Sequence, residues 1–294
     1  MSRGPLATDV SLPAGPAHDA AVATAQASGV EIQELVEVRD LKAVYSHIDS
    51  IWGPNLTQAP VSTEVLRALA KSGNYVVAAF AGEELVGTCV GFFAPPRSQT
   101  LHSHIAAVSP GGRGRSIGFA LKVHQRAWAI ARGVSTITWT FDPLVARNAY
   151  FNVAKLSATP EEYLPDFYGE MEDKINRNDA TDRLLMRWEL RSPRVASACR
   201  GVHDRVDAVQ LRTAGASVAL DRAADGSPRP GPSSGPTVLV AVPEDVERLR
   251  ETSPQLASDW RTALREALLP MMSDGARITG FDRTGWYIVS KEVP

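Results

Sequence analysis

The segment from Ala107 to Lys122, AVSPGGRGRSIGFALK, restricts the fold more than any other part of this chain. It reads as the end of a strand, a bend rich in glycine and arginine, and the start of an amphipathic helix. The N–H groups of a tight bend, followed by the unpaired N–H groups and positive dipole end of a helix, form an anion site. Arg113 and Arg115 add full positive charge there. The segment therefore predicts a site for the diphosphate of a nucleotide-tailed molecule.

The residues on both sides of the bend predict a strand, helix, strand unit. Apolar residues recur at spacings of three and four after the bend, and Gly133 ends that run. Before the bend, residues 101–108 predict a strand with His102 and His104 on one of its two alternating faces. After the helix, the β-branched and aromatic segment 134–141 predicts a buried neighbouring strand.

One interpretation of this unit is a dinucleotide site. Gly112, Gly114 and Gly118 spell G-x-G-x-x-x-G, and Asp142 follows the next strand, where a ribose-binding acid would lie. This alternative predicts an NAD(P)-dependent oxidoreductase. However, the pattern begins about a third of the way along the chain and occurs in one convincing unit only.

The other interpretation rests on a family resemblance. The segment resembles motif A of the Gcn5-related N-acetyltransferase (GNAT) superfamily, roughly V-x-P-x-x-R/Q-x-x-G-x-G/A, and Val108, Pro110, Arg113 and Gly118 match in register. The resemblance continues through 139–158 and 182–190 and covers about 31–190. Segments 138–144 (TWTFDPL) and 147–152 (RNAYFN) are similar to a bacterial subgroup whose substrates are not assigned.

The resemblance implies an α/β fold with a mixed sheet, the GNAT acyl-CoA N-acyltransferase fold. It also implies that a short acyl group moves from acetyl-CoA, or another acyl-CoA, to a small amine such as an amino acid by direct attack. Because some superfamily members of this kind succinylate amino acids, the acyl group stays open. The residues implied to bind the CoA ester are Ala106, Ala107, Val108, Arg113, Gly114, Arg115, Ser116, Ile117, Gly118 and Asn148.

Acyl transfer to an amine needs a base, and it can use an acid for the leaving thiolate. His102 and His104 are candidate bases, because an imidazole titrates near neutral pH; a core histidine is the alternative for either. Asp142 is a third candidate base; alternatively, its side chain caps the turn before Pro143. Tyr150 is the candidate acid, or else an aromatic packed on the sheet.

The chain departs from the family pattern at three positions. Serine replaces glycine at Ser116 and Ser157, and Val153 stands where the family often has its acidic tyrosine. A backbone with positive φ would cost a serine about 1 kcal/mol. A non-catalytic acyl-CoA-binding module is therefore an alternative to an enzyme.

Outside the motif, the pattern predicts four regions. These are a disordered tail at 1–30, the GNAT domain at 31–190, an irregular linker at 191–236, and a smaller strand, helix and hairpin unit at 237–294. The polar segment 161–182 is expected to border the acceptor pocket as a lid or partner-contacting loop.

Three arginines outside the motif are expected to lie mainly at the surface. Arg261 and Arg265, four residues apart on one helix, predict a solvated face. Arg183 is expected either to face solvent at a strand edge or to pair with an acceptor carboxylate.

Composition sets the remaining expectations. A net charge of −2 gives no general attraction to nucleic acid or to anionic membranes, and two cysteines are too few for a disulfide framework. We see no apolar run long enough to span a membrane and no signal-peptide core, so we expect a cytoplasmic protein. No histidine or cysteine cluster has the spacing of metal ligands. The expected partner is a small-molecule amine; a homodimer stays open.

Overall fold

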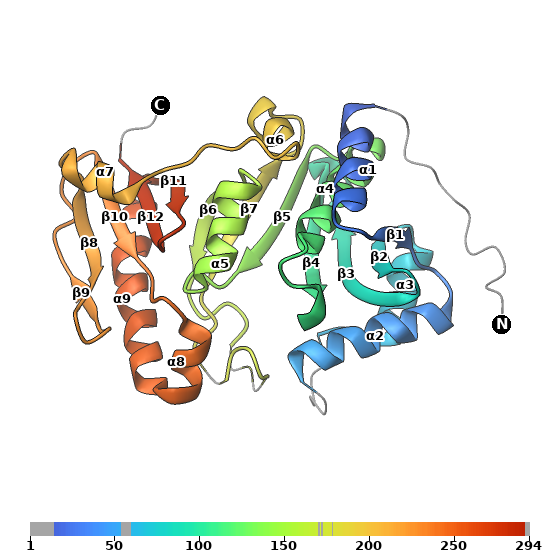
Figure 1. Ribbon diagram of the computed structural model, residues 1–294, viewed down its shortest axis with the longest axis horizontal. Coiled ribbons are helices and arrows are strands. Elements are labelled where there is room, and N and C mark those ends of the chain that lie inside the picture. The colour runs from blue at the N-terminus through green and yellow to red at the C-terminus, as the bar shows by residue number, and fades with distance from the viewer. Residues whose placement is uncertain (1–14, 54–59, 170, 172, 178, 292–294) are drawn as a thin grey trace. The chain divides into compact units, whose positions relative to one another are not determined.

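The computed structural model describes residues 15–53, 60–169, 171, 173–177 and 179–291. The chain divides into two compact units, each with its own core (Figure 1). The first unit holds the chain up to Thr138 together with Glu189–Ser192, and the second holds Trp139–Trp188 and the chain from Pro193 onward. The division falls inside strand β5, which contributes to both units.

The first unit has four α-helices, two short 3₁₀ turns and five strands among the described residues. The helices and turns are α1 (Pro16–Ala27), α2 (Val38–Trp52), α3 (Thr63–Lys71), η1 (Pro96–Ser98), η2 (Pro110–Gly112) and α4 (Ile117–Ala131). The strands are β1 (Glu31–Glu34), β2 (Tyr75–Ala81), β3 (Glu84–Phe93), β4 (Thr100–Val108) and the beginning of β5 (Thr136–Phe141).

The strands of the first unit form a sheet in the order β1-β2-β3-β4-β5. β1 to β4 pair antiparallel, and β4 pairs parallel with β5. The apolar side chains of α2 and α3 bury a core against β2, β3 and β4. α4 packs against β2, β3 and β4 as well, with Trp128 and Leu121 fully buried. The sheet is therefore mixed, as the resemblance implied.

The first helix corrects one prediction. The tail 1–30 was expected to be disordered, but Pro16–Ala27 forms α1, which packs against α4. Residues 1–14 lie outside the described part of the chain. The sequence pattern missed α1 because its buried face consists of small residues, Ala20 and Ala21, which give no bulky apolar periodicity.

The second unit continues β5 into a mixed arrangement of short helices and strands. Its helices are α5 (Ala146–Ala149), the π-helical turn η3 (Tyr150–Lys155), α6 (Pro193–Ala198), α7 (Ala208–Thr213), α8 (Val246–Thr252) and α9 (Pro254–Ser273). Its further strands are β6 (Thr159–Leu164), β7 (Arg183–Glu189), β8 (Ser217–Arg222), β9 (Pro228–Pro230), β10 (Thr237–Ala241), β11 (Arg277–Asp282) and β12 (Trp286–Ser290).

Two sheets meet in this unit. The order β5-β7-β6 continues the first sheet, and β6 pairs antiparallel with β7. A second sheet has the order β11-β12-β10-β8-β9, in which β8 and β10 are parallel. α9 packs against strands of both sheets, and its Trp260 and Leu264 are fully buried. The predicted strand, long helix and hairpin of 237–294 thus appear as β10, α9 and the β11–β12 pair.

The compact units do not follow the division expected at residue 190. Strands β6 and β7 belong to the same unit as α8 and α9: β6 packs against α9 and β11, and Asp182, just before β7, pairs with Arg265 of α9. The region 191–236 was expected to be an irregular linker with short helical fragments and a possible strand at 217–220; it contains α6, α7, β8, which begins at Ser217, and β9. No helix in the described ranges is both long and apolar enough to cross a membrane.

Candidate functional site

β4 separates from β5 after a short stretch of parallel pairing. The pairing runs over three residues of each strand and ends at His102 opposite Thr138. β4 then continues to Val108, and in the described part of the chain residues 103–108 pair with β3 alone. Backbone groups on the other edge of β4 are therefore open to a ligand.

A β-bulge lies at the point where β4 leaves β5. Val90 pairs with Ile105 and Gly91 with Ser103, so β4 advances two residues while β3 advances one. His104 is the extra residue. Such bulges bend a strand and redirect its side chains, and they are common beside active sites.

The alternation of backbone groups identifies which amides of β4 face the open edge. The N–H of Ser109 donates to the carbonyl of Val86 on β3 at 3.0 Å. Because successive N–H groups of a strand point to opposite edges, Ala107 also faces β3, whereas Ala106 and Val108 face away from it. Of the three residues expected to present a donor, this geometry favours Ala106 and Val108.

His102 and His104 are less buried than Leu101, Ser103 and Ile105 beside them, but the bulge breaks the expected alternation, because Ser103 contacts α4 whereas Ile105 packs in the core with α2 and α3. Their ring centroids are 6.1 Å apart, and both rings contact Phe92. Burial, together with the charges of His104 and Lys122, lowers the pKa of His102 to about 4. Partial burial also lowers the pKa of His104, while a hydrogen bond with the backbone of Pro60 opposes it. Both imidazoles are therefore mainly neutral at pH 7 and able to accept a proton.

The bend after β4 presents a row of backbone donors. In the described chain, the N–H groups of Gly114, Ser116, Ile117 and Gly118 have no backbone acceptor, whereas those of neighbouring residues bond within the bend. The last two open the first turn of α4, where the helix dipole is positive. This is the amide arrangement that binds a diphosphate.

The two arginines of the bend have different surroundings. The side chain of Arg113 is exposed and makes no hydrogen bond or ion pair with the described residues, although its backbone N–H donates to the carbonyl of Pro110 at 3.2 Å. Arg115 instead donates to the carbonyls of Ser28 and Gly29, at the end of α1, at 3.3 Å each. The geometry therefore favours Arg113 as the anion ligand and gives Arg115 a contact with α1.

Two residues of the bend have the left-handed backbone that favours glycine. Gly114 has φ of 82° and Ser116 has φ of 62°. Ser157, the second serine in a family glycine position, has φ of 52°. Both serines thus carry the strain that the sequence suggested, and each keeps its backbone N–H.

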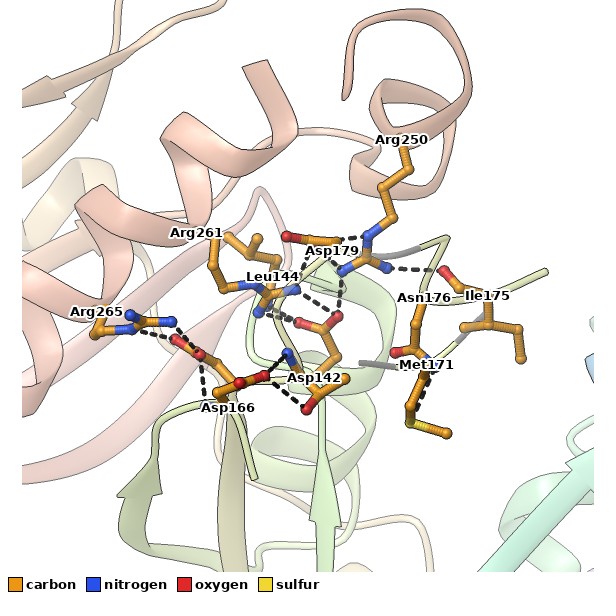
Figure 2. Close-up of polar contacts among 12 residues, drawn as sticks. Asp142, Leu144, Asp166, Met171, Ile175, Asn176, Asp179, Arg250, Arg261 and Arg265 are labelled. Atoms are coloured by element: carbon orange, nitrogen blue, oxygen red, sulfur yellow. Dashed lines mark hydrogen bonds and ion pairs between the residues drawn. The ribbon is translucent and has the colours of Figure 1, made fainter. Parts of the chain in front are cut away.

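Asp142, a candidate base, lies in a buried ionic cluster of the second unit (Figure 2). Arg261 donates to both of its oxygens at 2.8 and 2.9 Å, and Arg250 binds its Oδ2. The backbone N–H of Leu144 donates to its Oδ1 at 3.0 Å. Asp179 completes the cluster by accepting from both arginines at 2.9 Å.

This environment favours a structural role for Asp142. Burial alone would raise the pKa of its carboxyl group, but the charge and hydrogen bonds of Arg261, followed by the charge of Arg250, hold it well below the usual range. Its two oxygens already accept four hydrogen bonds, so no site is left for a substrate proton or for a ribose hydroxyl. The bond from Leu144 is the turn cap considered as the alternative.

Tyr150 and Asn148 lie next to each other in the second unit, at η3 and α5. The ring of Tyr150 is edge-on to His203, with centroids 6.4 Å apart. Both side chains are partly exposed, so each can reach a ligand. π-helical turns such as η3 are frequent at functional sites.

The segment 161–182 is held by hydrogen bonds. Tyr163 donates to Asp182 at 2.6 Å, and Arg265 forms an ion pair with the same carboxylate. Asp166 accepts from the N–H and hydroxyl of Thr181. The described residues at the two ends of the segment are therefore bonded to each other, and Asp182 is also bonded to α9.

Two surface predictions for arginines in this unit were wrong. Arg261, expected on a solvated face, is 2% exposed. Arg183, expected to face solvent or an acceptor, is buried and donates to Asn176 at 2.8 Å and to the carbonyl of Asp182 at 2.9 Å. The guanidinium of Arg261 finds its acceptors in segments 82 to 119 residues earlier in the chain, whereas the acceptors of Arg183 lie within seven residues of it.

Within the described residues, no group of three or more histidine, cysteine, aspartate or glutamate side chains is arranged to hold a metal ion.

Comparison with known proteins finds a family match over part of the chain. Residues 41–151 match the family model described as the acetyltransferase (GNAT) family. This range contains the bulge of β4, the donor-rich bend and α4. Over residues 41–151, the chain is similar to the proteins of this family.

Several solved structures are similar to the chain. The ribosomal-protein-S18-alanine N-acetyltransferase of Escherichia coli is 16% identical, with a TM-score of 0.44 over 55% of this chain and 94% of that one. An N-acetyltransferase of Staphylococcus aureus Mu50 is 16% identical, with a TM-score of 0.45 over 55% and 99%. The yncA protein of Salmonella typhimurium, solved with its cofactor acetyl-CoA, is 14% identical, with a TM-score of 0.45 over 55% and 94%. A search of curated proteins gave no match.

Sequence reasoning missed one polar group in the GNAT domain and one in the second unit. Lys122 lies within the amphipathic pattern of α4. It is buried there and donates a hydrogen bond to Ser103 of β4. Arg250 joins the cluster of Asp142 although 108 residues separate them in sequence. The helical period places position 122 on the inner face of α4, so a lysine there could have been noticed from the sequence. The pairing of Arg250 with Asp142 has no local sequence signal.

Proposed function

We propose that this GNAT domain transfers a short acyl group, acetyl in the first instance, from a CoA thioester to a small amine such as an amino acid. The N–H groups of Gly114, Ser116, Ile117 and Gly118 carry the proposal, because four donors without a backbone acceptor in the described chain, at a helix start, suit a diphosphate. Arg113 adds a charge beside them. The free edge of β4, with the amides of Ala106 and Val108, supports the binding of an extended amide-bearing arm.

The chemistry is a direct attack. The neutral amine forms a C–N bond with the thioester carbonyl, the C–S bond breaks, and CoA leaves as a thiolate that takes up a proton. An N–H of β4, at Ala106 or Val108, donates to the carbonyl oxygen as its negative charge grows.

The amine loses one proton, which His104 accepts directly or through a water molecule. His104 is the exposed residue of the bulge and is mainly neutral at pH 7, so it is available as a base. His102 is the alternative base. Its lower pKa and its 3.3 Å contact with Thr138 make it the weaker candidate. Tyr150 is the proposed acid and Asn148 a ligand of the CoA arm.

A second candidate function is a non-catalytic acyl-CoA-binding module. The observation that favours it is the positive φ at both Ser116 and Ser157, where the family has glycine. Strained serines at both positions would be tolerated in a protein that binds the ester without turnover. Measurement of thiol release separates this alternative from the enzyme.

The proposal is tested by calorimetric titration with acetyl-CoA, succinyl-CoA and NADPH, followed by thiol release with a panel of amines. Gly118→Pro removes one amide donor at a place in the first turn where helices tolerate proline. Gly118→Ala keeps that donor, and its added Cβ would meet its nearest atom at 3.7 Å.

We expect Gly118→Pro to weaken acyl-CoA binding about tenfold, the loss of one charge-assisted hydrogen bond, and Gly118→Ala to change it less than about threefold. Binding without thiol release for every amine would favour the non-catalytic module. Binding of NADPH but of neither CoA ester would contradict both functions.

A further inference from the structure

Lys122 lies on the inner face of α4 and is only 3% exposed. Its Nζ donates to Oγ of Ser103 on β4 at 3.1 Å and to Oε1 of Gln125, one turn further along α4, at 2.8 Å. Burial of an ammonium group is costly, because its hydration is lost. Packing alone therefore does not favour a lysine at this position.

The surroundings of Lys122 leave room for this polar cluster. Gly91 pairs with Ser103 across β3 and β4. A Cβ on Gly91 would lie 2.9 Å from the carbonyl oxygen of His102 and 3.2 Å from Nε2 of Gln125. The absence of a side chain at Gly91 thus lets Gln125 approach the sheet. Oγ of Ser103 also lies 3.9 Å from Sγ of Cys89, a weak hydrogen bond.

The position of Ser103 connects this cluster to the candidate site. Ser103 stands between His102 and His104, and His104 is the extra residue of the bulge. A bond that fixes Ser103 therefore fixes the backbone from which both imidazole groups extend. The same bond fixes β4 to α4, whose first turn presents the amides of the bend.

We propose that Lys122 is a positioning residue for the acyl transfer proposed above: its bond to Ser103 holds the bulge of β4 against α4 and so fixes both imidazoles relative to the amides of the bend. The inference rests on the proposed function. It assigns to Lys122 a role that is exerted through Ser103 and not through contact with substrate.

The charge of Lys122 acts on the site in a second way. Burial lowers the pKa of Lys122 to about 8, while the thiol of Cys89 on β3 opposes the shift, so the lysine is mainly charged at pH 7. The groups that act on His102 are its own burial, His104 on the same strand and Lys122 on α4. Removal of the Lys122 charge therefore raises the pKa of His102 from about 4 toward the value of 6.5.

Three variants separate the contribution of the bond between Lys122 and Ser103 from that of the Lys122 charge. Lys122→Met removes both the bond and the charge, whereas Ser103→Ala removes the bond to β4 and keeps the charge. Gln125→Ala is the matched control, because it removes a bond of the same lysine within α4 and leaves the bond to β4. Each variant is measured for kcat and KM with acetyl-CoA, for the pH profile of kcat/KM, and for the titration of both histidines by NMR.

We expect kcat to fall at least about tenfold in Lys122→Met and in Ser103→Ala, with KM for acetyl-CoA changed less than about threefold, since misplaced groups slow the reaction more than they weaken binding. Gln125→Ala should stay within about threefold in kcat. The titration of His102 should move to higher pH in Lys122→Met only. A merely structural role would change thermal stability without this shift.

The inference is contradicted if Lys122→Met and Ser103→Ala match Gln125→Ala in kcat and if His102 titrates as in the wild type. Should Lys122→Met not fold, Ser103→Ala against Gln125→Ala decides the question alone. A wild-type protein that transfers no acyl group to any amine contradicts the proposed function and this inference with it. An active wild type with unaltered variants contradicts the inference only.

Discussion

Arg261 binds Asp142 through two parallel hydrogen bonds, from Nη1 to Oδ1 at 2.8 Å and from Nη2 to Oδ2 at 2.9 Å, although 119 residues separate them in sequence. Both side chains are buried, with 2% of the arginine and 10% of the aspartate side chain exposed. The pair joins the end of β5 to α9. It therefore makes the C-terminal segment part of the unit that contains β6 and β7.

The first prediction concerns this pair. Asp142→Asn leaves Arg261 with an uncompensated buried charge, and we expect the free energy of unfolding to fall by about 3–5 kcal/mol. The control is Glu247→Gln, which breaks the exposed pair with Arg147 and should cost less than about 1 kcal/mol. Urea denaturation measures both. Equal losses in the two variants would contradict a special role for the buried pair.

The same pair gives a pH dependence of defined sign. Because the pKa of Asp142 is held well below its usual range in the folded protein, its contribution to stability is fully present above its unfolded pKa, about 3.9. The contribution is lost only as the pH falls through the lower, folded pKa. The stability difference between wild type and Asp142→Asn should thus be constant from pH 7 to about 5 and shrink below about 4. A difference that grows as the pH falls from 7 to 5 would mean that the folded pKa of Asp142 lies above its unfolded value, and would reopen its role as a base.

The elements of the first sheet were predictable because local signals mark them. Gly73 and Gly82 punctuate the β2–β3 hairpin, and apolar spacing marks α2 and α4. α1 was not predicted, because its buried face consists of alanines, which give no bulky apolar spacing. In the site, the bend was visible as a motif, since its donors are consecutive in sequence.

The ionic cluster could not be predicted from sequence. Arg261 and Arg265 lie four residues apart, which indicates that they share a helix face. This spacing does not indicate whether that face is exposed to solvent or buried. The partners of these arginines are carboxylates, Asp142 and Asp179 for the buried Arg261 and Asp182 for the half-buried Arg265, which lie 82 to 119 residues earlier in the chain. The bulge at His104 could not be predicted from the sequence either, because it depends on the register between β3 and β4.

The second prediction concerns the strained serine of the bend. Ser116 has φ of 62°, so Ser116→Gly should leave the free energy of unfolding unchanged or raise it by up to about 1 kcal/mol. Ser72, an exposed residue with φ of −81°, is the control, and Ser72→Gly should lower it by about 0.5–1 kcal/mol. Thermal denaturation measures both. Equal losses at the two positions would show that Ser116 carries no strain.

The third prediction separates the two arginines of the bend. Arg113 is free to meet an anion, whereas Arg115 is engaged with the carbonyls of Ser28 and Gly29. Arg113→Ala should weaken acetyl-CoA binding about tenfold, and Arg115→Ala less than about threefold. Arg115→Ala should instead speed amide exchange in α1. Calorimetry and hydrogen exchange measure these effects, and the reverse order of affinities would make Arg115 the anion ligand.

The fourth prediction is that Lys122 lowers stability where it is charged. Its pKa is lowered to about 8 in the folded protein, against about 10.4 in the unfolded chain, so the unfolded state binds more protons between these values and wild-type stability rises with pH there. At pH 7 the burial of the Lys122 charge lowers the free energy of unfolding by about 3 kcal/mol, because the pKa of the lysine differs by roughly two and a half between the unfolded and the folded state. Lys122→Met avoids this cost but loses two hydrogen bonds, so it should be at least as stable as the wild type at pH 7. Its advantage over the wild type should decline between about pH 8 and 10. Denaturation curves across this range measure the difference, and a difference independent of pH would show that the ammonium is not desolvated by burial in α4.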